Sequence, residues 1–142
     1  MYEYACEVQR IIDGDSIVGR ISLGFDIYFN SSIRLFAIDT PESRTRNLDE
    51  KARGLLAKDF LKDCIENGKR IVIKTELKDS RGKFGRVLAT LWVDGVNINQ
   101  ALVDNYLAVA YHGQAKKDVE DEHLANRQKL IDLNIYKPEA KT

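Results

Sequence analysis

The sequence has little of what membrane spans, zinc sites and disulfide scaffolds require. No run approaches the roughly 20 apolar residues that a helix needs to cross a bilayer, so we expect no membrane-spanning segment. With two histidines and two cysteines, the chain is poorly supplied for a protein zinc site. Cys6 and Cys64 form no CxxC pair, and Cys64 lies in an apolar helical stripe. We therefore expect free thiols, with a Cys6–Cys64 bridge as the alternative.

The chain also lacks net charge, since its 22 basic residues balance its 22 acidic ones. Proteins dedicated to nucleic-acid binding are usually basic, because much of their affinity comes from neutralised phosphates. Zero net charge therefore argues against that class, but it leaves a local basic cleft open. Residues 1–10 are polar and contain no apolar signal-peptide core. As written, the sequence predicts a cytoplasmic protein, with secretion open if it is a trimmed mature form.

The composition is that of one globular domain. The 142 residues are 44% hydrophobic and 31% charged, and they contain no repeat or linker. We expect a single domain over residues 1–142, with a monomer as the default. The length is sufficient to bury a core without disulfides or metals as staples.

The first third of the chain predicts an antiparallel meander. Asp13-Gly14 is a strong hairpin signal between apolar segments. Asn30 to Ser32 is polar and is expected to interrupt the strand material on either side. Strands are predicted over residues 4–12, 16–23, 25–29 and 33–38.

The remainder predicts helices alternating with strands. Leu56, Phe60 and Cys64 repeat at i, i+4 and i+8, which favours a helix that starts between Asn47 and Gly54 and stops at Asn67-Gly68. Further strands are predicted over 70–77, 86–93 and 107–111, helices over 96–106 and 119–133, loops over 43–48 and 79–85, and a frayed end over 137–142. Among small β architectures, the best match is an α+β, mainly β fold: a five-stranded OB-fold barrel capped by three helices.

Three acidic residues lie at predicted strand ends or turns. They are Asp15, Asp39 and Glu42. Hard divalent cations prefer oxygen ligands, so Asp15 and Asp39 could bind one through their carboxylates, and Thr40 through its carbonyl. The competing interpretation is ordinary turn chemistry, which we favour for Asp13.

Two arginines could hold a phosphate next to such a cation. Arg34 lies between apolar strand residues, where pointing to solvent is the simpler interpretation. Arg86 follows Gly85, and glycine permits close approach of a bulky anion. The guanidinium fork matches phosphate oxygens. Arg34 and Asp39 are five residues apart, however, so a regular strand would place them on opposite faces. They can converge only if the chain bends between residues 37 and 40.

Three segments of the sequence together carry a family resemblance. They are IDGDS at 12–16, RLFAIDTPE at 34–42 and KFGR at 83–86, with LNIY at 133–136 as a further match. In identity, order and spacing they resemble the staphylococcal nuclease (thermonuclease) family, from about Val8 to Tyr136. The resemblance implies an OB-fold barrel with three helices.

The resemblance also implies a role for each site residue. One Ca²⁺ would be bound by Asp15, Asp39 and the Thr40 carbonyl. Glu42 would act as general base, or at least orient the attacking water. The two arginines, Arg34 and Arg86, would hold the phosphate and stabilise the charge that grows on its oxygens. Lys83 would contact a substrate phosphate, and Tyr111 would stack on a base, unless Tyr111 is an ordinary half-buried aromatic.

The activity that the resemblance implies is endonucleolytic cleavage of DNA and RNA. Single strands would be preferred, with little sequence specificity and with 3′-phosphate ends. Ser16, Phe84 and Gly113 depart from the family pattern, where threonine, tyrosine and a second aromatic are usual. These departures bear on substrate affinity rather than on the chemistry. The alternatives are a non-catalytic OB-fold nucleic-acid-binding module and a protein-interaction domain with surface acids.

Overall fold

The computed structural model describes residues 2–75 and 86–138. Its strands are β1 (Tyr2–Asp13), β2 (Ser16–Ser22), β3 (Tyr28–Leu35), β4 (Ile38–Asp39), β5 (Ile71–Thr75), β6 (Val87–Val93), β7 (Val96–Asn97) and β8 (Val109–Ala110). Its helices are α1 (Leu48–Asn67), α2 (Ile98–Asp104) and α3 (Lys116–Asp132).

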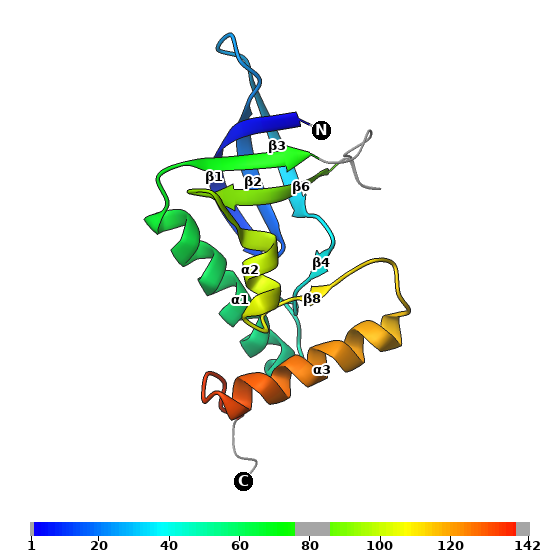
Figure 1. Cartoon of the computed structure of the whole chain (residues 1–142). Coiled ribbons are helices and arrows are strands. Elements are labelled where there is room, and N and C mark those ends of the chain that lie inside the picture. The colour runs from blue at the N-terminus through cyan, green and yellow to red at the C-terminus, as the bar shows by residue number, and fades with distance from the viewer. Residues whose placement is uncertain (1, 76–85, 139–142) are drawn as a thin grey trace.

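Strand β1 is long enough to pair with two neighbouring strands, so it belongs to both halves of the barrel. Its first residues pair with β5 and its later residues with β2, with register shifts beyond Val8 that bend the strand. β2 continues into β3, and β5 pairs with β6. A parallel pairing of β3 with β6 joins the two ends (Figure 1). The predicted five-stranded barrel with three helices is confirmed.

The barrel encloses an apolar core because side chains alternate along each strand. Ile17 and Ile21 of β2 point inward, as do Ile33 and Leu35 of β3. Each fully buried side chain of this size stabilises the fold by about 1.5–3 kcal/mol. The face of β3 that points away from the core is left to polar residues, among them Arg34.

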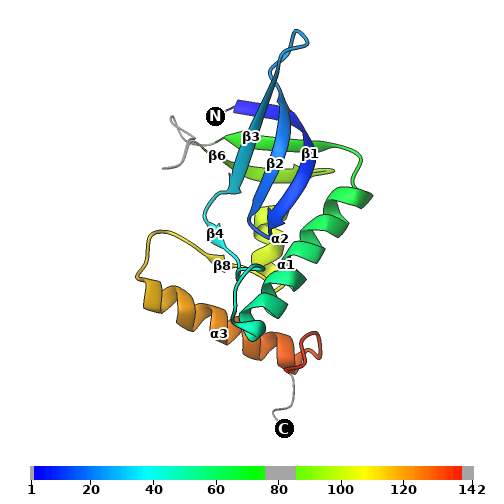
Figure 2. The ribbon, with the colours of Figure 1, turned by 180° about the vertical axis from the view of Figure 1, so that it is seen from behind.

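The helices lie below and beside the barrel. α1 begins at Asn47, whose side chain caps the helix by accepting from the Glu50 N–H. It starts next to α3 and runs up beside the barrel, and α3 lies across the end of the molecule farthest from the β2–β3 hairpin (Figures 1 and 2). The short strands β4 and β8 pair with each other between the barrel and α3. None of the helices in the described ranges is long and apolar enough to span a membrane.

Two predictions in the first third of the chain are wrong. Residues 30–32, expected to interrupt the strand, lie inside β3 and pair with β2, since a partner strand satisfies a polar segment as readily as an apolar one. Residues 25–26, expected to be strand, form the hairpin turn. Phe25 and Asp26 have left-handed φ values of 54° and 59°, and Leu23 N–H bonds to the Ile27 carbonyl at 2.8 Å.

Later boundaries also shift. The helix expected over 96–106 is split into β7 and α2, and the strand expected over 107–111 shortens to β8. The loop expected over 43–48 is not wholly exposed, since Ser43 is buried. Both cysteines are free thiols; Cys6 is buried and Cys64 is half-buried. Burial, with a smaller contribution from Glu7, raises the pKa of Cys6 to about 11.

Candidate active site

The β1–β2 turn fixes Asp15 at the bottom of the barrel. A Cβ on Gly14 would lie 2.7 Å from the Cβ of Ala57, so glycine lets α1 pack directly against this turn. Asp15 is only 7% exposed. Its carbonyl accepts from Leu35 N–H at 2.8 Å, and its Oδ2 accepts from Thr40 N–H at 3.0 Å. The end of β3 therefore holds the backbone of Asp15, and the segment after β4 holds its carboxylate.

A backbone bend brings Arg34 and Asp39 together. β3 ends at Leu35, and Ala37 takes a left-handed φ of 64° before β4 begins. Arg34 Nη1 then lies 3.0 Å from Asp15 Oδ2, and Nη2 lies 3.5 Å from Asp39 Oδ1. The predicted departure from the strand is confirmed. One guanidinium thus lies between two carboxylates.

A histidine that sequence reasoning missed completes this group. His123 Nε2 of α3 lies 2.7 Å from Asp39 Oδ2, and its side chain is 13% exposed. The two residues are 84 positions apart, and a lone histidine on a helix belongs to no motif. We call Asp15, Arg34, Asp39 and His123 the ion-site cluster.

The donor set fits a hard divalent cation. Asp15 and Asp39 supply two carboxylates directed at one guanidinium. Thr40 follows Asp39 in the chain, and its N–H donates to Asp15 Oδ2. Thr40 is buried, and its Oγ1 has no hydrogen-bond partner among the described residues. Over those same ranges, no three His, Cys, Asp or Glu side chains group as metal ligands. Two carboxylates, with carbonyl and water oxygens for the rest, suit Ca²⁺ rather than zinc.

Glu42 is exposed on a segment whose backbone is fixed. Its N–H donates to Glu50 Oε2 at 3.1 Å. A Cβ on Gly54 would lie 2.4 Å from the Glu42 carbonyl oxygen, so α1 supports this segment at van der Waals distance only because residue 54 is glycine. Asp13 accepts from Ser43 N–H at 3.2 Å, so it anchors the same segment as well as ending β1.

Of the three remaining expected residues, the structure describes Arg86 and Tyr111. Arg86 is half-buried and immediately precedes β6, which runs parallel to the strand that carries Arg34. Tyr111 is 44% exposed, and its N–H donates to the Ala37 carbonyl at 2.8 Å, so it adjoins the bend. Lys83 lies outside the described residues.

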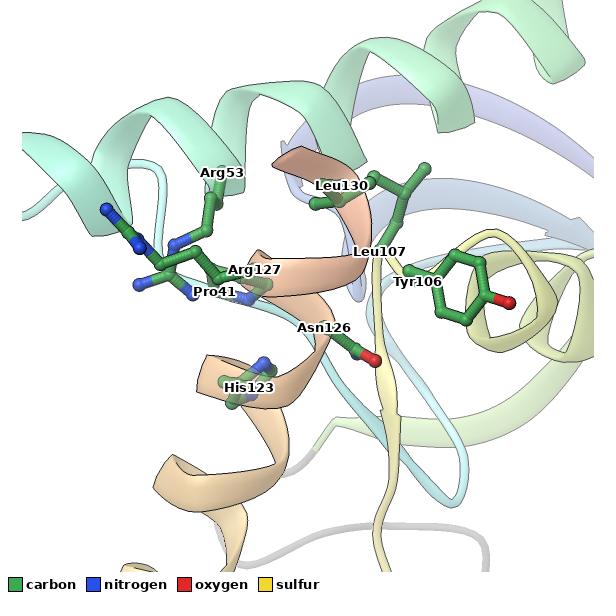
Figure 3. Close-up of a pocket in the computed structure, with 8 residues that line it drawn as sticks. All are labelled: Pro41, Arg53, Tyr106, Leu107, His123, Asn126, Arg127 and Leu130. Carbon is green, nitrogen blue, oxygen red and sulfur yellow. The ribbon is translucent and has the colours of Figure 1, made fainter. Parts of the chain in front are cut away.

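A second polar group ties α1 to α3. Arg53 and Arg127 reach into the space between the helices (Figure 3). Both donate to Asp49 through Nε, at 3.2 and 3.1 Å, and the Tyr136 hydroxyl donates to it as well. We call these four residues the α1–α3 cluster. The pocket there, which its own side chains fill, is lined by Pro41, Arg53, Tyr106, Leu107, His123, Asn126, Arg127 and Leu130.

The α1–α3 cluster lowers the pKa of its carboxylate. Burial acts to raise the pKa of Asp49, but the hydrogen bonds from Tyr136 and Arg127 and the charges of Arg53 and Arg127 outweigh it, so the pKa falls below 3.8. For Tyr136, burial and the bond to Asp49 raise the pKa above 10.0. The cluster therefore favours a charged Asp49 and a neutral Tyr136.

Known proteins resemble this chain over most of its length. It is 32% identical to the SPbeta prophage-derived endonuclease YokF of Bacillus subtilis over 91% of the chain, but over only 44% of that protein. It is 32% identical to the thermonuclease of Staphylococcus intermedius over 91% of the chain and 74% of that protein. With the thermonuclease of Staphylococcus hyicus, the identity is 28% over 94% and 76%. The chain thus spans less than half the length of YokF. It spans about three quarters of the length of each of the two thermonucleases.

A family model matches most of the chain. The model described as staphylococcal nuclease homologue matches residues 32–130, well over half of the chain. The matched segment includes Arg34, Asp39, Glu42 and Arg86, and it ends on the helix that carries His123. The chain belongs to the staphylococcal nuclease homologue family.

Proposed function

We propose that this chain is a calcium-dependent endonuclease that hydrolyses phosphodiester bonds in DNA and RNA. It prefers single strands, has little sequence specificity and leaves 3′-phosphate ends. The observation that carries the proposal is the convergence of Asp15 and Asp39 on Arg34. Two carboxylates gathered beside one guanidinium combine ligands for a hard cation with a donor for phosphate oxygens.

One Ca²⁺ would be held by the carboxylates of Asp15 and Asp39 and by the Thr40 carbonyl. Two carboxylates that face one arginine and one imidazole keep acceptor lone pairs that a divalent cation can fill. When bound, such an ion acts as a Lewis acid on a phosphoryl oxygen. The Thr40 hydroxyl, for which the described part of the chain offers no hydrogen-bond partner, is a further oxygen close to these ligands.

The chain's own residues would bind the substrate and accept the proton of the attacking water. Arg34 and Arg86 donate to the phosphate oxygens, whose charge rises as water attacks phosphorus, and this contribution is usually the largest in such reactions. Glu42 accepts the proton of the attacking water, directly or through a hydrogen bond, and its exposure lets water reach it. Tyr111, exposed beside the bend, stacks on a base without regard to its identity. Lys83 contacts a phosphate.

The rival proposals differ in what Glu42 must do. A non-catalytic barrel that binds nucleic acid has no need for Glu42 next to two ion ligands, and a protein-interaction domain needs no ion at all. The names of similar proteins, endonuclease and thermonuclease, favour an enzyme.

Cleavage of single-stranded DNA by the purified chain tests the proposal. Wild type is assayed with Ca²⁺ and with EDTA, together with Glu42→Gln and a control, Glu66→Gln, at the far end of α1. We expect cleavage that needs Ca²⁺, collapses in Glu42→Gln and persists in Glu66→Gln. A folded wild type that binds the strand without cutting it would support the non-catalytic barrel. If it bound neither Ca²⁺ nor DNA, the protein-interaction domain would be favoured.

A further inference from the structure

Asp39 is held at both carboxylate oxygens by groups from distant parts of the chain. Oδ1 faces Arg34 Nη2 of β3 at 3.5 Å, and Oδ2 faces His123 Nε2 of α3 at 2.7 Å. The His123 side chain is largely buried. The shorter and more enclosed of the two contacts therefore comes from the helix, not from the barrel.

The strand that carries Asp39 has little support of its own. β4 consists of two residues, and within residues 2–75 and 86–138 its one partner strand is β8, which is equally short. The Asp39 side chain is about a third exposed, so burial does not fix its rotamer. An ion ligand in such a position needs an external group to hold its carboxylate plane.

Helix α3 is anchored to the same pair of strands. Asn126 Nδ2 donates to the Ala108 carbonyl at 3.0 Å, next to β8, and Val109 of β8 pairs with Asp39. His123 and Asn126 are three residues apart, so they project from neighbouring turns of α3 on one side (Figure 3). Asn126 fixes the distance between α3 and β8, and His123 adds a second contact, from α3 to Asp39 of β4. This is the arrangement of a positioning group.

We propose that His123 is a positioning residue of the ion site, which holds the Asp39 carboxylate through an Nε2–H donor and thereby sets the affinity for Ca²⁺. The inference rests on the proposed Ca²⁺ site. The bond occupies one lone pair of Oδ2 and leaves the others on the carboxylate for an ion. Groups that orient a ligand in this way typically contribute about 10- to 100-fold to metal affinity.

A purely structural contact would behave differently. Loss of a contact that only joins α3 to β4 lowers the free energy of unfolding but leaves the Ca²⁺ affinity of the folded protein unchanged. A positioning contact changes that affinity even where the stability change is small. Glutamine in place of His123 can still donate an N–H, whereas alanine and phenylalanine cannot.

The test is calorimetric titration of Ca²⁺ into the full chain, without substrate. His123→Ala is expected to bind about 10- to 100-fold more weakly than wild type. His123→Gln, or added imidazole with His123→Ala, is expected to restore part of the loss. His112→Ala is the matched control, because His112 is the other histidine and is exposed; its affinity is expected to be that of wild type.

Urea unfolding in EDTA accompanies the titrations. If His123→Ala does not unfold cooperatively, His123→Phe, which keeps a ring but no donor, decides the question. Equal or tighter Ca²⁺ binding in the variants that lack a donor overturns the inference and leaves the proposed function in place. Absence of Ca²⁺ binding by folded wild type overturns the proposed function itself. The two failures are thus distinguishable.

Discussion

The ion-site cluster and the α1–α3 cluster both combine aspartates with arginines, in opposite proportions, and each adds one further side chain, His123 or Tyr136. In the first, two carboxylates share one guanidinium. In the second, one carboxylate receives two guanidiniums and a phenol. The α1–α3 cluster is satisfied by the chain alone, whereas the ion-site cluster has a surplus of acceptors. Among the described residues, the buried Thr40 hydroxyl near these carboxylates has no hydrogen-bond partner, so this group suits a ligand.

The largest contrast is expected from truncating the acid at the centre of each cluster. Asp39→Ala removes an ion ligand, so cleavage of single-stranded DNA should be abolished and Ca²⁺ binding weakened. Asp49→Ala should lower the free energy of unfolding, because it leaves Arg53 and Arg127 without their acceptor, but should retain Ca²⁺-dependent cleavage below its melting temperature. Normal cleavage by Asp39→Ala would contradict the ion assignment.

Substitutions of Arg86 and Arg127 should show the same contrast between activity and stability. Arg86→Ala removes a donor to the phosphate in the transition state, and comparable single donors are worth about 3–4 kcal/mol in kcat/KM. Arg127→Ala removes a contact that joins α1 to α3, so urea unfolding should change more than kcat/KM. A loss of less than about tenfold for Arg86→Ala would argue against its role.

A smaller effect is expected where α1 supports the Glu42 segment. Gly54→Ala adds a Cβ that would meet the Glu42 carbonyl at 2.4 Å, so the segment must shift. Misplacement by about 1 Å can cost up to about 100-fold in rate, with little change in Ca²⁺ affinity. Leu55→Ala, at the next and exposed position of α1, is the control. Unchanged kcat in Gly54→Ala would show that Glu42 tolerates movement of its backbone.

The smallest effect is the acid dependence of stability. Since the pKa of Asp49 is lowered in the folded protein, its contribution is fully present above its unfolded value of 3.8 and is lost as pH falls through the folded value. Unfolding free energies measured against pH should show wild type more stable than Asp49→Asn at neutral pH, with the gap narrowing below about pH 4. A gap that does not change with pH would show that the charge on Asp49 contributes nothing.

The sequence predicts structural features that depend on neighbouring residues, and it misses those that depend on residues far away in the chain. The need for a bend between Arg34 and Asp39 followed from strand periodicity, and Ala37 supplies it with a left-handed φ. The contact of His123 with Asp39 could not be predicted, since it spans 84 positions and depends on where α3 packs. The strand character of residues 30–32 was missed because pairing with β2, rather than local polarity, decides it.

The most direct test of the central claim is calorimetric titration of Ca²⁺ into wild type, Asp15→Asn and Asp49→Asn. The substitutions remove one carboxylate charge from each cluster and keep the side-chain shape. We expect one bound ion in wild type, greatly weakened binding in Asp15→Asn and wild-type affinity in Asp49→Asn. Absence of binding by folded wild type, or equal affinity in all three, would contradict the claim.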